Sequence, residues 1–177
     1  AVRRVVQTST SEVYGTAQTL PLGESHPLQG QSPYAASKIG ADKMAEAYAL
    51  SFNVPVAVLR PFNTYGPRQS ERAVIPTIIR QALDPACDAI RLGDTSTTRD
   101  FSYVADTVAA FVSIGQAPDI DFGTPYNVGT GRALSVAEIA DRVCRLTGTN
   151  KSIRNDPARL RPERSELRAL LADSARF

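Results

Sequence analysis

Histidine is almost missing from this sequence, and cysteine is scarce. The only histidine, His26, lies in a stretch that contains Pro and Gly, which predicts an exposed loop residue. A single histidine in a loop supports neither a histidine-based metal site nor a Ser-His-Asp triad. We therefore expect no metal. The two cysteines, Cys87 and Cys144, lack the paired spacing of zinc ligands. Isolated thiols of this kind are typical of a reducing cytoplasm, where we expect the protein to be.

A strong charge imbalance and long apolar runs are missing too. The formal net charge is only +2 at pH 7, which favours neither a nucleic acid nor a membrane surface as partner. No run reaches the roughly 18 consecutive apolar residues of a membrane-spanning helix. The 177 residues are 42% hydrophobic and 21% charged. They can therefore bury the core of one domain, or of one domain plus a small lobe.

The start of the chain predicts a βαβ unit. Residues 4–8 and 56–59 are short apolar runs typical of buried strands. Between them, Ser32 and Pro33 predict a helix start, and residues 35–51 are rich in good helix formers. Strand, helix and strand in this order imply a parallel sheet. Further along we predict helices at residues 74–83 and 104–114, a strand at 126–128, a helix from the Ser135/Glu138 capping box to near Gly148, and a short helical patch at 166–172.

Polar side chains with catalytic potential directly follow the first predicted strand. Thr10, Ser11 and Glu12 occupy this place, and ligands of open parallel sheets bind at the carboxyl ends of strands. A Ser/Thr-rich turn with a solvated glutamate would have the same sequence. This segment alone therefore leaves both interpretations open.

A tyrosine and a lysine stand four residues apart at the start of the predicted helix. This spacing puts Tyr34 and Lys38 on one helical face, one turn apart. An ammonium close to a tyrosine favours the phenolate, the form that can accept a proton. Helices contain such pairs by chance, so an amphipathic helix with an exposed lysine is the alternative.

A third polar segment, Arg-Pro-Phe-Asn-Thr-Tyr-Gly-Pro-Arg at residues 60–68, follows the second predicted strand. The carboxyl ends of parallel strands meet at one edge of a sheet. Three segments of this kind at equivalent ends are hard to attribute to chance. We therefore expect them to form one functional site.

Together these segments resemble the extended short-chain dehydrogenase/reductase family, which comprises NAD-dependent nucleotide-sugar epimerases, dehydratases and decarboxylases. The resemblance rests on residues 10–15, 32–38 and 60–67, on Thr98-Arg99-Asp100-Phe101 and on Tyr126-Asn127-Val128-Gly129.

The resemblance implies an α/β fold in two parts. One is the C-terminal part of a Rossmann-type doubly wound parallel sheet, in residues 1–66 and 100–129. The other is a small mixed α/β lobe for the nucleotide sugar, in residues 67–99 and 130–177. Members of the family tend to form homodimers through the helix that bears the catalytic tyrosine, here Tyr34.

The resemblance also implies roles for individual residues. Tyr34, Lys38 and Thr10 would remove the proton of the sugar's 4-hydroxyl, and Glu12 and Ser11 would act at C5 and C6. The implied cofactor is NAD, with NADP not excluded, and its contacts are Ser9, Tyr34, Lys38, Pro61 and Thr64. The implied contacts of the nucleotide-diphosphate sugar are Asn63, Val74, Arg99, Asn127 and Arg161.

Glu12 narrows the implied reaction. Thr10-Ser11-Glu12 resembles the sugar 4,6-dehydratases, whereas 4-epimerases of the family usually have a small or neutral residue in place of the glutamate. Residues 37–43, 67–77 and 161–166 are similar to dehydratases that act on nucleotide-linked N-acetylglucosamine. UDP-glucuronate decarboxylases share Thr-Ser-Glu. A decarboxylase or 4-epimerase therefore stays an alternative, and so does a non-catalytic nucleotide-sugar-binding module.

The glycine-rich dinucleotide fingerprint does not occur in the sequence. In doubly wound folds that motif follows the first strand of the sheet, upstream of the strand at residues 4–8. The chain starts at Ala1 without Met, and we interpret it as truncated at both ends. We expect the 177 residues alone to bind cofactor poorly and to turn over little.

Overall fold

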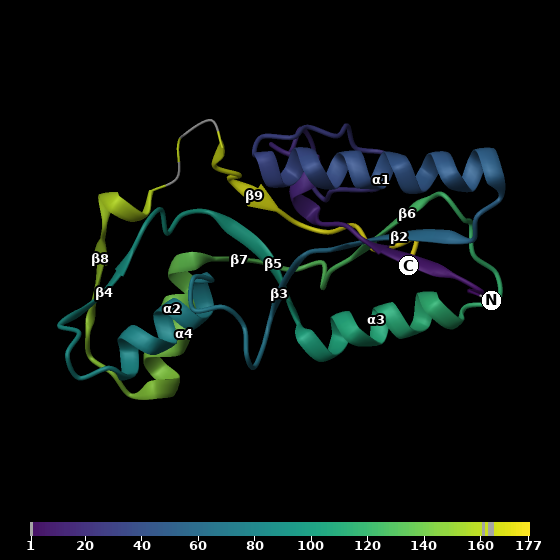
Figure 1. The fold of residues 1–177 in the computed structure, drawn as a ribbon. Coiled ribbons are helices and arrows are strands. Elements are labelled where there is room, and N and C mark those ends of the chain that lie inside the picture. Colours follow the sequence, from purple (N-terminus) through teal and green to yellow (C-terminus); the bar gives the residue numbers. More distant parts are fainter. Residues whose placement is uncertain (1, 161, 163–164) are drawn as a thin grey trace.

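The computed structural model describes residues 2–160, 162 and 165–177, and a parallel sheet lies at the centre of one end of the molecule (Figure 1). Its strands are β1 (Val5–Thr8), β2 (Val56–Pro61) and β6 (Pro125–Val128), in the order β1-β2-β6. Both pairings are parallel, with Val5 opposite Val56 and Val58 opposite Pro125. The predicted α/β fold with a Rossmann-type parallel sheet is confirmed.

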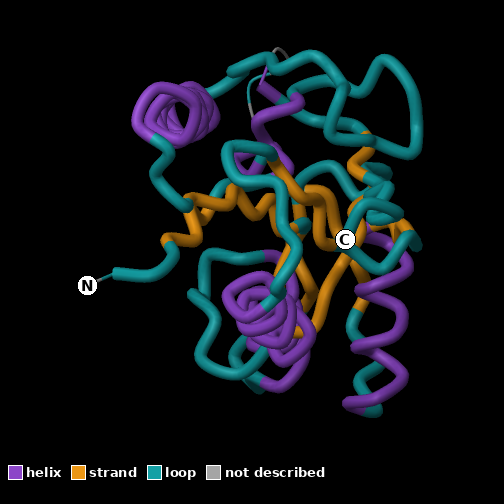
Figure 2. The backbone as a smooth tube through the Cα atoms, turned by 90° about the vertical axis from the view of Figure 1, so that its right-hand side faces the viewer, coloured by secondary structure: helices purple, strands orange, loops and turns teal. Residues whose placement is uncertain are grey.

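Two helices cover the opposite faces of this sheet, α1 (Pro33–Phe52) and α3 (Val104–Gln116). Neighbouring side chains of a strand point to opposite faces. Because residues 56–60 of β2 are all buried, this strand packs against both helices. Its Ala57 and Leu59 pack against Ala110 and Ile114 of α3. Figure 2 views the same layers along the helix axes, with the strands between the helices.

The helix ends follow from local chemistry and match the predictions closely. The Ser32 hydroxyl accepts a hydrogen bond from the Ala35 N–H at 3.0 Å, and Pro33 occupies the first helical position of α1. The helix ends at Asn53, whose φ of 55° is left-handed. The capping box of Ser135 and Glu138 is also present, at the start of α4 (Val136–Thr147).

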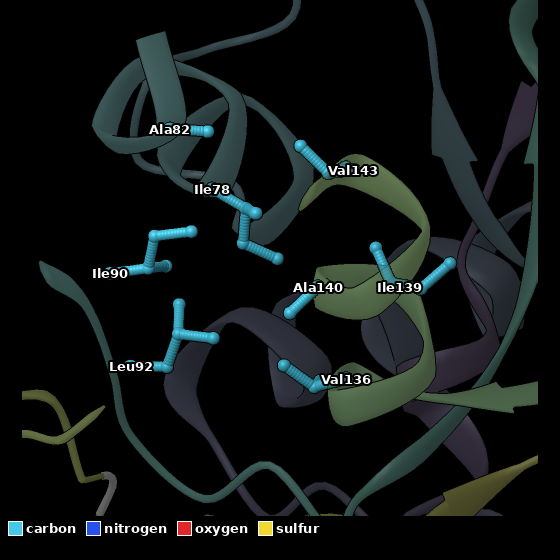
Figure 3. Packing of buried hydrophobic residues seen from close by; sticks show 8 residues of the cluster. All are labelled: Ile78, Ala82, Ile90, Leu92, Val136, Ile139, Ala140 and Val143. Carbon is cyan, nitrogen blue, oxygen red and sulfur yellow. The ribbon is translucent and has the colours of Figure 1, made fainter. Parts of the chain in front are cut away.

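A second hydrophobic core lies at the other end of the molecule. It is built from α2 (Val74–Leu83) and α4, which pack against the parallel pair β4 (Ala89–Leu92) and β8 (Ser152–Asn155). Figure 3 shows the apolar side chains that meet there, namely Ile78, Ala82, Ile90, Leu92, Val136, Ile139, Ala140 and Val143. Burial of this apolar surface, at roughly 25 cal/mol per Å², holds the two helices together.

A small mixed sheet connects the two ends (Figure 1). Its strands are β3 (Asn63–Tyr65), β5 (Thr98–Tyr103), β7 (Ala133–Ser135) and β9 (Ala169–Leu170). The strand β3 pairs in parallel with β5, and the β5–β7 pair is antiparallel. The described residues also include the short 3-10 turns η1 (Ser11–Tyr14) and η2 (Pro157–Arg159).

Two sequence predictions are wrong. The helical patch at residues 166–172 is instead extended: β9 pairs with β5, and Ala172 bridges to Leu22. Leu170 and Ala172 are buried while the residue between them is half-buried, and this alternation favours a strand over the helix that the composition suggested. His26 is only 9% exposed, because its ring accepts from the Gln18 N–H and bonds the Pro27 carbonyl.

Within the described part of the chain, no helix combines the length and the apolar character needed to cross a membrane. Cys87 and Cys144 are free thiols, as predicted.

Candidate active site

The segment from Ser9 to Gly15 forms a tight turn directly after β1. The Thr10 side chain caps it by accepting a hydrogen bond from the Glu12 N–H at 3.3 Å. The turn ends at Gly15, whose φ of 64° is left-handed and where an added Cβ would lie 2.6 Å from the Gln29 carbonyl oxygen. We call residues 9–15 the catalytic turn, because it carries three of the residues expected to be catalytic.

Tyr34 and Lys38 lie next to this turn, on the first turns of α1. The Lys38 ammonium donates a hydrogen bond to the carbonyl of Thr8, the last residue of β1, at 2.9 Å. The same nitrogen lies 5.9 Å from the centre of the Tyr34 ring. Tyr34 itself is 50% exposed, so its ring is open to a ligand.

Glu12 and Tyr34 line the same cavity, of about 360 Å³, although they are far apart in the sequence. The rest of its wall consists of Gln31, Ser32, Ala35, Ser165 and Leu167. Ser11 is only 2% exposed and is not part of this wall. The cavity therefore holds a carboxylate and a phenol, the two groups that can move protons at two different atoms of one ligand.

A second cavity, of about 320 Å³, contains several of the residues expected to bind the nucleotide sugar. Asn63, Val74 and Arg99 line it, as do two further cations, Arg72 and Arg159, and Thr64, which was expected to contact the cofactor. Several guanidinium groups at one cavity favour an anionic ligand such as a diphosphate. Arg99 also donates to the Glu166 carboxylate at 3.1 Å.

Residues 165–167 run between the two cavities. Ser165 and Leu167 line the first cavity, whereas Glu166 lines the second. Leu167 is also part of a buried cluster with Tyr14 and Phe62, which fixes the segment. Neighbouring residues of this segment therefore contribute to the walls of both cavities.

Two of the residues expected to contact a ligand, Asn127 and Ser9, form side-chain hydrogen bonds within the protein. Asn127 is fully buried; its amide donates to the Leu22 carbonyl and its Oδ1 accepts from the Tyr14 hydroxyl at 2.6 Å. That Asn127 contacts the substrate stays a prediction. The Ser9 hydroxyl donates to Asp42 at 2.8 Å, which leaves no free hydroxyl proton for the cofactor.

The remaining expected residues are placed as follows. Pro61 ends β2, and the Thr64 hydroxyl lies 3.0 Å from that of Thr107 on α3. Arg161 falls outside the described residues.

A buried polar network beneath the catalytic turn escaped the sequence analysis. Asp42 and Arg60 form an ion pair at 3.1 Å, and their side chains are 0% and 1% exposed. Arg60 also donates to the Tyr14 hydroxyl at 3.1 Å. Burial raises the pKa of Tyr14 above its ordinary value of 10.0 although Arg60 opposes the rise, so the hydroxyl stays protonated and donates to Asn127. The available signal was the spacing of Tyr34, Lys38 and Asp42, which puts all three on one stripe of the helix.

The family model described as GDP-mannose 4,6 dehydratase matches residues 2–177 of the chain. Among curated relatives, a dTDP-glucose 4,6-dehydratase of Actinoplanes is 34% identical over 85% of this chain and 46% of its own length. A UDP-glucose 4-epimerase of Mycolicibacterium smegmatis is 35% identical over 90% of this chain and 51% of its own length.

Solved structures agree with the sequence relatives. The dTDP-glucose 4,6-dehydratase of Bacillus anthracis, solved in complex with NAD, superimposes with a TM-score of 0.84 and 29% identity, over 98% of this chain and 53% of that one. The chain thus spans about half the length of the relatives it matches.

Proposed function

The chain belongs to the NAD-dependent epimerase/dehydratase family of extended short-chain dehydrogenases, and on that premise we propose that it carries the catalytic residues of a nucleotide-sugar 4,6-dehydratase. The observation that supports this reaction is that Glu12 lies in one cavity with Tyr34. A 4-epimerase needs a base only at the 4-hydroxyl, whereas a dehydratase needs a second proton-transfer group at C5. The shared cavity supplies both.

The residues expected to hold the nicotinamide end of NAD suit that group. Lys38 uses one hydrogen bond on the Thr8 carbonyl, and a lysine ammonium has three donors. The others can therefore bind ribose hydroxyls. Tyr34 is half exposed beside it. Pro61 is at the carboxyl end of β2, the edge of a doubly wound sheet where dinucleotides bind, and Thr64 follows on β3. When bound there, NAD would accept the hydride from C4 and return it to C6.

The protein groups would move the protons of this reaction. Tyr34, aided by Lys38 and Thr10, takes the proton of the 4-hydroxyl, so that loss of hydride from C4 leaves a ketone. The ketone acidifies the C5–H bond, and Glu12 removes that proton. Glu12 then gives that proton to the 6-hydroxyl, which leaves as water. When the hydride has reached C6, Glu12 would pass a solvent proton to C5, and Tyr34 would release to solvent the proton taken from the 4-hydroxyl, so that the protons balance. The buried Ser11 hydroxyl supports the turn and is a poor proton donor.

We propose a nucleotide-linked N-acetylglucosamine as the sugar, from the similarity of residues 37–43 and 67–77 to dehydratases of such sugars. The test is to incubate the natural polypeptide that contains this chain separately with UDP-N-acetylglucosamine, GDP-N-acetylglucosamine and UDP-glucuronate. A dehydratase gives a product lighter by one water with a 4-keto group. An unchanged mass with inversion at C4 would assign a 4-epimerase, loss of carbon dioxide from UDP-glucuronate a decarboxylase, and binding without turnover a binding module.

Arg99 is expected to contribute to affinity for the diphosphate. Replacing it by Met should raise the KM for the nucleotide sugar on the order of 10- to 100-fold, because a hydrogen-bonded charge is lost and Glu166 then faces the phosphates without its partner. The value of kcat should change little, because the contact is the same in ground and transition states. The control is Arg142→Met, on the exposed face of α4. A fall in kcat at unchanged KM would contradict this role.

We also propose a homodimer that uses α1. Met44, Tyr48 and Phe52 are 58%, 49% and 70% exposed and follow one another at intervals of four residues. They form an apolar stripe along one side of the helix, of the kind that marks an interface.

A further inference from the structure

The ion pair of Asp42 and Arg60 holds both ends of the catalytic turn. At one end, the Ser9 hydroxyl donates to Asp42 Oδ2 at 2.8 Å. At the other end, the Tyr14 hydroxyl accepts from Arg60 at 3.1 Å. Arg60 joins the two because its Nε donates to the same Asp42 oxygen at 3.1 Å. Thr10, Ser11 and Glu12 lie between these two fixed points.

The same ion pair ties the turn to the helix that carries Tyr34. Tyr34, Lys38 and Asp42 follow one another at intervals of four residues along α1, so successive turns of the helix present them on one stripe. Lys38 bonds the carbonyl of Thr8, and Asp42 bonds the hydroxyl of Ser9. The helix is thus fastened to two consecutive residues at the end of β1, next to the cavity that Tyr34 and Glu12 share.

We propose that Asp42 is a positioning residue, which acts through Ser9 and Arg60 to hold Thr10 and Glu12 at a fixed place relative to Tyr34. This proposal depends on the proposed function in one respect only, namely which reaction the positioned residues catalyse. Asp42 lines neither cavity, so it acts on the substrate only through the residues that it holds.

Stability alone does not account for this pair. Two charges removed from water lose hydration that their mutual attraction often fails to recover, and well-packed apolar residues frequently replace such pairs without loss. The cost is higher here because Asp42 Oδ1 has no hydrogen-bond partner among the described residues. The pair supplies directional contacts that apolar residues would not. Two hydrogen bonds to one Asp42 oxygen, from Ser9 and Arg60, and one from Arg60 to Tyr14 fix the position of the turn.

The test removes the Ser9–Asp42 and Tyr14–Arg60 hydrogen bonds one at a time and leaves both charges of the ion pair in place. Ser9→Ala deletes the hydroxyl at one end of the turn, and Tyr14→Phe deletes the one at the other end. The matched control is Ser102→Ala, which removes a hydroxyl that is equally buried, at 2% exposure, and has no partner among the described residues. The variants are made in the natural polypeptide that contains this chain, and hydrogen exchange of the backbone amides of residues 12–15 is followed.

We expect Ser9→Ala and Tyr14→Phe to speed amide exchange in the catalytic turn by about tenfold or more, because each loses a hydrogen bond to a charged network. They should also lower kcat on the order of 10- to 100-fold with KM within about twofold, because misplacement of reacting groups affects the transition state most. Ser102→Ala should change neither.

Exchange rates equal to those of Ser102→Ala, or a looser turn with unchanged kcat, would overturn the proposal. A merely structural role would lower thermal stability and leave kcat of the folded protein intact. Asp42→Asn provides a second measurement, with a larger loss of kcat expected in the fraction that folds. If the wild-type protein converts no nucleotide sugar, the proposed function fails, and the exchange data alone decide whether the turn depends on Asp42.

Discussion

Replacing Tyr34 by phenylalanine is expected to lower kcat by roughly 10²- to 10⁴-fold, the usual contribution of a positioned general base. The fold should be unaffected, because Tyr34 is 50% exposed and belongs to none of the three buried hydrophobic clusters of the described residues. Steady-state kinetics on the natural polypeptide, with the thermal unfolding midpoint measured alongside, would check both parts.

Tyr48→Phe is a well-matched control for this change. Tyr48 lies on the same helix and is 49% exposed, so the same atom is removed from the same kind of environment, outside both cavities. Its kcat should stay within about twofold of the wild type, since Tyr48→Phe keeps the apolar ring that the proposed dimer interface uses and Tyr48 lines neither cavity. Equal activity of the two variants would exclude Tyr34 as the base.

Much of the fold follows from local sequence signals. The start of α1 at Ser32-Pro33 and the capping box of α4 depend only on residues within one helical turn, so both can be predicted without knowing the rest of the chain. The predicted bounds of α2 agree with the structure for the same reason: its apolar periodicity is complete within residues 74–83.

The errors arise where contacts distant in sequence decide the outcome. Residues 169–170 have the composition of a helix but form β9, because β5 offers free backbone groups some 70 residues earlier in the chain. The motif that contains Asn127 gave no sign that its side-chain amide completes a buried network with Tyr14 and Leu22. Asp42 was overlooked because a single acidic residue in a helix is indistinguishable from a solvated one until its partner, Arg60, is placed beside it.

The sequence predicts that Glu12 and Tyr34 lie close together, but it does not predict that they line one cavity. Both residues follow from the rule that carboxyl ends of parallel strands gather at one edge. That the carboxylate of the turn and the phenol of the helix face the same space depends on the tie between the turn and α1. The sequence therefore predicts which groups are present, and the structure adds which of them can reach one ligand.

Glu12→Gln is the change that separates the two reactions of this family. In a dehydratase the variant keeps the hydrogen-bonding shape of the side chain but cannot take the C5 proton, so formation of the dehydrated product should fall by roughly 10²- to 10⁴-fold. Oxidation at C4 depends on Tyr34 and should survive. In deuterated water, the wild type should exchange the C5 proton, and the variant should not.

A 4-epimerase never removes the C5 proton, so in that enzyme Glu12→Gln should leave turnover within a few-fold and the wild type should show no deuterium at C5. The control is Glu71→Gln, an exposed carboxylate that lines neither cavity, which should behave as wild type in either case. Dehydration that persists in Glu12→Gln would assign the C5 base to another group. A dehydratase would lose the removal of the C5 proton, whereas a 4-epimerase has no such step to lose. Substitution of Glu12 therefore separates the two reactions more clearly than that of any other residue of the candidate site.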